Sequence, residues 1–161
     1  MTFKEQLESR KLEAREIYEK EAIKEKITKP SLIDEVLSFD FSKLDTLSPD
    51  KLHNYAGALA QQIIWLNSFV NGVNIGVVTT EEFLNQILGQ ETLKVEGKSE
   101  KEKVNRVMAN IPELLEIKND LINQQSKLAF YSNKIDTYNG LLNIIKKVLD
   151  SHRSPYQHFA N

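Results

Sequence analysis

The stretch LAFYSNKIDTYNGLLNIIKKVLDSH, residues 128–152, repeats an apolar side chain alternately every three and four positions. Such spacing gives a helix one continuous apolar stripe, and over several heptads it is typical of a helix that packs lengthwise against another helix. The same spacing extends back to Pro112, which suits the first position of a helix. The sequence therefore predicts one long helix from Pro112 to about Ser151.

Two heptad positions form the seam of this helix. The first position holds Leu114, Leu121, Leu128, Ile135, Leu142 and Leu149, and the second holds Ile117, Gln124, Tyr131, Tyr138 and Ile145. Gln124 is the kind of polar seam residue that fixes register, and Gly140 is a costly residue within a helix that can permit a bend or a close approach. The pattern leaves open whether the partner helix belongs to the same chain or to a second copy. For an oligomer it predicts an interface of Trp65, Leu114, Ile117, Leu121, Leu128, Tyr131, Ile135, Tyr138, Leu142, Ile145 and Leu149.

The first 44 residues differ in character from the rest of the chain. Residues 2–27 are dense in Glu, Lys and Arg, which predicts a charged helix that projects as an arm and ends before Pro30. Apolar residues crowd together between Ser31 and Leu47, which predicts a short helix followed by an irregular packed segment. We therefore expect residues 1–44 to form an arm and a connector, and residues 45–161 to form a helical core domain.

Local signals divide the core domain further. Ser48, Pro49 and Asp50 are typical of a helix start, and apolar residues recur at helical spacing up to NGVNIG, residues 71–76, where we expect a turn. A helix is then predicted from Thr79 or Thr80 to about residue 88, followed by a loop or short hairpin at 89–98. Ser99 and Glu102 form a capping box that predicts another helix from residue 100. The predicted fold class is all-α.

Composition excludes several classes of function. The chain of 161 residues has no cysteine, so it has no disulfide and no thiolate site, and we expect it in the cytoplasm. The first residues mix acids and bases, and we expect no later window to approach the length of a membrane span, so we expect no membrane association. The three histidines are scattered, and no phosphate-binding glycine loop or catalytic motif occurs. We expect no enzymatic activity, no metal and no cofactor.

Aromatic and basic residues alternate along the predicted last helix. Lysines at 127, 134, 146 and 147 lie among Phe130, Tyr131 and Tyr138, and from residue 118 onward the chain has 6 bases and 3 acids. Single-stranded nucleic acids are held by aromatic rings that stack on bases beside cations that contact phosphates. Both tyrosines also belong to the seam, so core packing is the competing explanation for them.

Several segments, taken in order, resemble the small helical recombination mediators of tailed phages. Lys51-Leu52, the small residues 56–60 and Trp65-Leu66-Asn67 are similar to an early helix of that family. EKEKVNRVMANIPELLEIKNDL is similar to the segment before its last helix, and KIDTYNGLLNIIKKVLDSHRSPYQ is similar to that helix. The resemblance covers roughly residues 45–158.

The resemblance implies a ring-forming homo-oligomer without chemistry of its own. It implies binding to single-stranded DNA, to a strand-exchange recombinase and to a single-strand-binding protein. The cations expected to contact phosphates are Lys94, Lys98, Lys101, Lys103, Arg106, Lys127, Lys134, Lys146, Lys147 and Arg153. In this hypothesis, the protein loads the recombinase onto DNA in the host cytoplasm.

Two other hypotheses fit the same residues. The charged arm is typical of a structural or assembly subunit, for instance of a virion, in which the arm docks on a neighbouring subunit and no DNA is bound. The wide apolar helix faces also suit an adaptor or inhibitor that binds only a protein.

Overall fold

The computed structural model describes residues 2–21 and 28–153. These residues form α1 (Phe3–Glu21), α2 (Ile33–Ser38), the 3-10 helix η1 (Phe41–Thr46), α3 (Pro49–Thr92), α4 (Glu100–Asn110) and α5 (Pro112–Arg153). No strand occurs in the described ranges, and the predicted all-α class is confirmed. The short hairpin allowed for at residues 89–98 is therefore not formed.

The long last helix and its neighbour agree with their sequence signals. α5 begins at Pro112 as predicted and runs through the whole heptad pattern. α4 begins after Ser99, whose hydroxyl accepts a hydrogen bond of 3.2 Å from the backbone N–H of Glu102. The Glu102 carboxylate reaches back one residue further than a standard capping box requires, and it accepts 2.9 Å from the backbone N–H of Lys98. The predicted cap is confirmed.

α3 corrects the prediction of a turn at residues 71–76. It is one helix of 44 residues, and none of its residues has a positive φ. Val70, Val73 and Val77 keep the helical spacing of apolar residues through the segment, and Val77 is buried. Burial of this stripe outweighs the poor helix propensity of Gly72 and Gly76, which is about 1 kcal/mol for each glycine. The predicted restart at residue 79 or 80 is wrong for the same reason.

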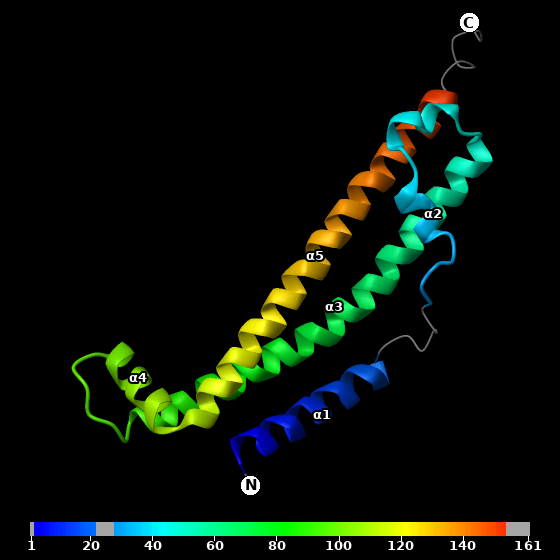
Figure 1. Ribbon diagram of the computed structural model, residues 1–161. Helices are drawn as coiled ribbons and strands as arrows, with labels where there is room; N and C mark the ends of the chain where they lie inside the picture. The colour runs from blue at the N-terminus through cyan, green and yellow to red at the C-terminus, as the bar shows by residue number, and fades with distance from the viewer. Residues whose placement is uncertain (1, 22–27, 154–161) are drawn as a thin grey trace, which may run out of the picture. The chain divides into compact units, whose positions relative to one another are not determined.

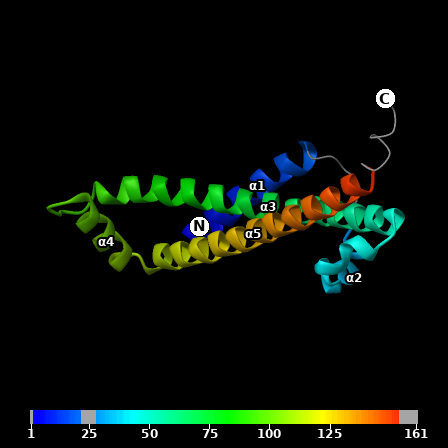
Figure 2. The same cartoon turned by 90° about the horizontal axis from the view of Figure 1, so that it is seen from above.

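The chain divides into two compact units at places other than residue 44. The first unit contains Met1–Glu25 and Val70–Phe130, and the second contains Lys26–Phe69 and Tyr131–Asn161. Each unit therefore holds one half of α3 and one half of α5, and within a unit these halves run side by side in opposite directions (Figures 1 and 2). Contacts in such a helix pair are made between nearby turns, so each unit forms its own core with the short elements packed there.

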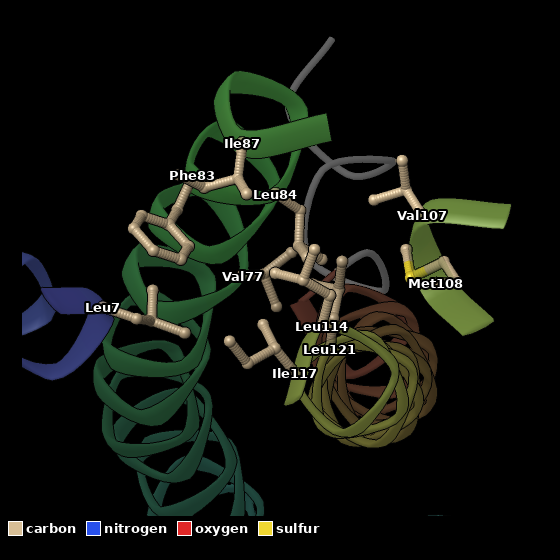
Figure 3. Close-up of a cluster of buried hydrophobic side chains, with 10 residues drawn as sticks. All are labelled: Leu7, Val77, Phe83, Leu84, Ile87, Val107, Met108, Leu114, Ile117 and Leu121. Atoms are coloured by element: carbon tan, nitrogen blue, oxygen red, sulfur yellow. The ribbon is translucent and has the colours of Figure 1, made fainter. Parts of the chain in front are cut away.

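The core of the first unit is formed by α1, α3, α4 and α5. Figure 3 shows Phe83 of α3 facing Leu7 of α1, while Val107 and Met108 of α4 face leucines of α5. The complete cluster is Leu7, Val77, Phe83, Leu84, Ile87, Val107, Met108, Leu114, Ile117 and Leu121.

Helix α1 contributes to this core, contrary to the prediction of a projecting arm. Leu7 is 3% exposed, and the rings of Phe3 and Phe83 meet edge to face with centroids 6.4 Å apart. Lys4 donates its backbone N–H to Glu113 at 2.8 Å and forms an ion pair with Glu116. The end predicted for this helix, at residue 27, lies outside the described residues.

The core of the second unit is formed by α2, η1 and this unit's halves of α3 and α5. Its buried residues are Ile33, Val36, Leu44, Leu52, Tyr55, Ala58, Leu59, Ile145 and Leu149. The predicted short helix after Ser31 is present as α2. The segment after it is η1, whose first turn is capped by Asp40 accepting 3.1 Å from the backbone N–H of Ser42. Residues 31–47 are therefore part of this unit's core and do not form a separate connector.

Candidate interaction surface

Five of the predicted oligomer contacts on α5 are already covered inside their own chain. Leu114, Ile117 and Leu121 are buried in the first unit, and Ile145 and Leu149 are buried in the second. Contact with a second copy through these five side chains would require the two helices to separate. The heptad pattern left open whether the partner helix belongs to the same chain or to a second copy. For these five residues the partner helix is α3 of the same chain.

The other predicted seam residues are covered less completely. Leu128, Tyr131, Ile135, Tyr138 and Leu142 are all half-buried. The polar seam residue Gln124 lies against α3, where a β-carbon on Gly76 would come within 2.9 Å of its Oε1 atom. Gly140 is exposed, and no atom of the described residues lies within 4 Å of a β-carbon placed on it, so this glycine is not at a close approach to any of them.

An aromatic cluster in the second unit joins α3 to α5. The rings of Trp65 and Phe69, one helical turn apart, meet edge to face with centroids 4.6 Å apart. The Phe69 ring in turn stacks on Tyr131 of α5, with centroids 6.1 Å apart and an interplanar angle of 26°. Phe69 remains 42% exposed, while Trp65 and Tyr131 are half-buried. Phe69 therefore offers aromatic surface that the described residues do not bury.

Cations accompany this cluster on α5. Lys134 is exposed and lies three residues after Tyr131, which places it beside that ring on the helix surface. Lys146 and Lys147 are exposed further along the same helix. The part of α3 that belongs to this unit carries only Asp50 and Lys51 as charged residues. Arg153 ends α5, and its side chain lies outside the described residues.

The predicted cations near α4 belong to the first unit and are balanced by acids. Lys94 forms an ion pair of 2.6 Å with Glu91, and Arg106 forms one of 2.7 Å with Glu102. Hydrogen bonds from the Lys98 backbone and from Arg106 lower the pKa of the Glu102 carboxyl, so that it stays ionised there. This pairing reduces the positive field that the sequence alone suggested.

The remaining cations of this group differ in exposure. Lys98, Lys101 and Lys127 are exposed, whereas Lys103 is half-buried with its Cγ 2.8 Å from the position of a β-carbon on Gly97. Of the ten predicted cations, Lys134, Lys146 and Lys147 are the described ones that share a unit with the aromatic cluster. The structure thus divides the predicted DNA-binding set between two units.

Polar contacts attach α2 to α3 near the buried start of α3. The Tyr55 hydroxyl donates 2.9 Å to Oε1 of Glu35, and Lys51 forms an ion pair with the same carboxylate. Hydrogen bonds from Lys51 and Tyr55 lower the pKa of the Glu35 carboxyl. Burial and the bond to Glu35 raise the pKa of Tyr55, which keeps its hydroxyl protonated as the donor. This network has a structural role, because Tyr55 and Lys51 both interact with the Glu35 carboxylate and thereby hold α2 against α3.

Hollows of about 310 Å³ accompany these helices in both units. The hollow in the first unit has an apolar floor of leucines, Val104 and Met108, with Glu81, Asn85 and Lys118 at its edge. A hollow in the second unit lies beside Gly57 of α3. Among the described residues, no three His, Asp or Glu side chains are grouped so that they could hold a metal ion.

One expectation about membranes has to be corrected. Within the described ranges, α3 contains a window of 18 residues with a mean hydropathy of 1.2, long and apolar enough by length and composition to cross a membrane. The reason is that residues 52–80 contain no Asp, Glu, Lys or Arg. Only 17% of the window is buried, so this helix is less covered than the core helix of a soluble protein usually is.

Comparison of the chain with protein-family models, with curated proteins and with solved structures finds no match. The aromatic cluster could not be recognised in the sequence because its rings come from two helices that are far apart in the chain. The absence of charged residues from 52 to 80 was the signal in the sequence that could have identified α3 as an unusually apolar helix.

Proposed function

We propose that this protein is a non-enzymatic recombination mediator that binds single-stranded DNA, acts as an oligomer and helps to load a strand-exchange recombinase. The observation that carries the proposal is the incompletely buried cluster of Trp65, Phe69 and Tyr131, with exposed Lys134 beside it. Aromatic rings next to a cationic helix surface are the features by which proteins bind single strands without sequence preference.

The proposal assigns the DNA site to the second unit. Stacking of a base on Phe69 would cover aromatic surface that is 42% exposed, next to the Tyr131 ring on which Phe69 stacks. Lys134, Lys146 and Lys147 share the unit of the aromatic cluster and would contact phosphates, whereas Lys94 and Arg106 belong to the other unit and would contribute little. The recombinase and the single-strand-binding protein enter the proposal through the family resemblance alone.

The intrinsic fluorescence of the protein gives a direct test, because Trp65 is its single tryptophan. Titration with an unlabelled single-stranded oligonucleotide should change Trp65 emission in a saturable way, and duplex of the same sequence should have a smaller effect. Phe69→Ala and Tyr131→Ala should each weaken binding by about 1–3 kcal/mol, the usual contribution of one stacked base. The control is Phe130→Ala, an exposed aromatic that is not one of the three rings, which should bind as the unaltered protein does.

A structural or assembly subunit is the second candidate function. The charge-free run of α3 favours it, since a surface without cations has no electrostatic attraction for DNA. In that case Trp65 emission would not respond to any nucleic acid, and the cluster would be a contact for another protein. The charged first helix gives this candidate little support, because the start of α1 is packed in the first unit.

A further inference from the structure

The outer side of α3 in the second unit is exposed yet uncharged. In a chain with 27% charged residues, the part of α3 from Leu52 to Phe69 has no Asp, Glu, Lys or Arg. Gly57, Gln61 and Ile64 of this part are exposed, on the side of the helix away from the buried Leu59 and Leu66. Solvent-facing helix surfaces normally carry charges, so this surface resembles one that is covered by another molecule.

A hollow and a protruding side chain lie on this same surface. The hollow of about 310 Å³ is lined by Pro30, Ser31, Leu32, His53, Asn54, Gly57, Ala58 and Gln61. A β-carbon placed on Gly57 would have no atom of the described residues within 4 Å, so these residues leave the space above this glycine open. Ile64 is 55% exposed and follows Gly57 by seven residues, which is two helical turns and about 10 Å along the same face.

We propose that this surface pairs with the same surface of a second copy, with Ile64 of each copy seated in the hollow beside Gly57 of the other. A two-fold interface requires that a residue i contact a residue j and that j contact i. An antiparallel pair of α3 helices centred between Gly57 and Ile64 meets this requirement at both positions. The second copy fits because one chain supplies both the protruding side chain and the hollow.

The chemistry of the surface disfavours charged occupants. A polyanion would find no lysine or arginine among the described residues that line the hollow. An uncharged surface neither repels its own copy nor attracts a charged partner, so association should depend little on salt. This inference specifies the oligomer of the proposed function and does not require DNA binding.

Sedimentation equilibrium of the full chain, without nucleic acid, tests the pairing. Gly57→Leu fills the hollow, and the open space around Gly57 and the helix propensity of leucine should keep the variant folded, as circular dichroism would verify. Ile64→Asp removes the protruding side chain and leaves the hollow unchanged. This second variant tests the pairing even if Gly57→Leu does not fold. Both variants should raise the dissociation constant of self-association at least about tenfold.

The matched control is Gly140→Leu, which changes an exposed glycine of α5 with equally open surroundings. It should associate as the unaltered protein does, at both low and high salt. The proposal is overturned if the unaltered protein is monomeric at every concentration, or if both test variants associate normally. A third result would also overturn it. If the monomer binds lipid vesicles or an oligonucleotide and Gly57→Leu abolishes that binding, the hollow has another occupant.

Discussion

The hydroxyl of Tyr55 in α3 donates a hydrogen bond of 2.9 Å to the Glu35 carboxylate in α2. Lys51 pairs with the same carboxylate, and together these contacts lower the pKa of Glu35 in the folded protein. A carboxyl whose pKa is lowered by folding stabilises the fold above its unfolded-state pKa, and the stabilisation is lost as pH falls through the folded-state pKa. The free energy of unfolding should therefore decrease as the pH drops below about 5.

Replacement of this carboxylate should remove that part of the pH dependence. Glu35→Gln keeps an oxygen that can accept from Tyr55 but has no charge, so its free energy of unfolding should vary less between pH 6 and pH 3 (about the range over which free carboxyls titrate). Urea unfolding at several pH values measures the difference. The exposed Glu13, changed to Gln, serves as the control, and equal slopes for the two variants would contradict the assignment.

A buried amide in the second unit should cost stability. Gln62 is 4% exposed, and in the described part of the chain its Oε1 atom has no hydrogen-bond partner. Gln62→Leu replaces it with an apolar side chain of similar size, so the free energy of unfolding should rise by about 1 kcal/mol. Thermal unfolding measures the effect, and Gln90→Leu, at an exposed position of the same helix, should stay within about 0.5 kcal/mol of the unaltered protein. A less stable Gln62→Leu would mean that the amide does have a partner.

The packing of α1 in the core of the first unit should depend on the side of the helix that carries Leu7. Leu7 is 3% exposed, and an aspartate in its place would put a charge among the buried apolar side chains around Phe83. Leu7→Asp should therefore speed amide hydrogen exchange along α1 and destabilise the unit by about 3 kcal/mol or more. Leu12, which is 59% exposed, is the matched position, and Leu12→Asp should have little effect. Equal effects of the two variants would argue that α1 is not packed through Leu7.

The two groups of cations should contribute unequally to binding of single strands. Lys134→Glu reverses a charge in the unit of the aromatic cluster, whereas Lys94→Glu changes a lysine of the other unit. Lys134→Glu should weaken binding and reduce the slope of log affinity against log salt by about 0.7 for each phosphate that the protein no longer neutralises. Lys94→Glu should change both quantities less. A larger loss of affinity for Lys94→Glu than for Lys134→Glu would indicate that the DNA site lies in the first unit.

Much of the fold could be predicted because strong signals are local. Pro112 with the heptads, and Ser99 with Glu102, predicted the starts of α5 and α4 correctly. The turn at 71–76 was wrong because burial of the apolar stripe that ends at Val77 keeps the segment helical, and Gly76 lies at a helix contact opposite Gln124, where a β-carbon would come within 2.9 Å of Oε1. Glycine in a turn and glycine at a helix contact look alike in sequence, and only the partner helix distinguishes them.

The candidate surface could be predicted less well. Tyr131 was assigned to a seam whose partner helix the sequence left open, and in the structure it stacks on Phe69 of its own chain. That contact joins distant residues, and no local pattern reports it. The balance of Lys94 by Glu91 and of Arg106 by Glu102 was visible in the spacing of three and four residues, yet only the structure shows which acids take part.

The most direct test of the central claim is the fluorescence anisotropy of a labelled oligonucleotide, single-stranded and then duplex, titrated with the protein at two salt concentrations. We predict preferential binding of the single strand and a steep loss of affinity at the higher salt. Absence of binding at low salt, or equal binding of the duplex, would contradict the proposed function and leave assembly as the function of these helices.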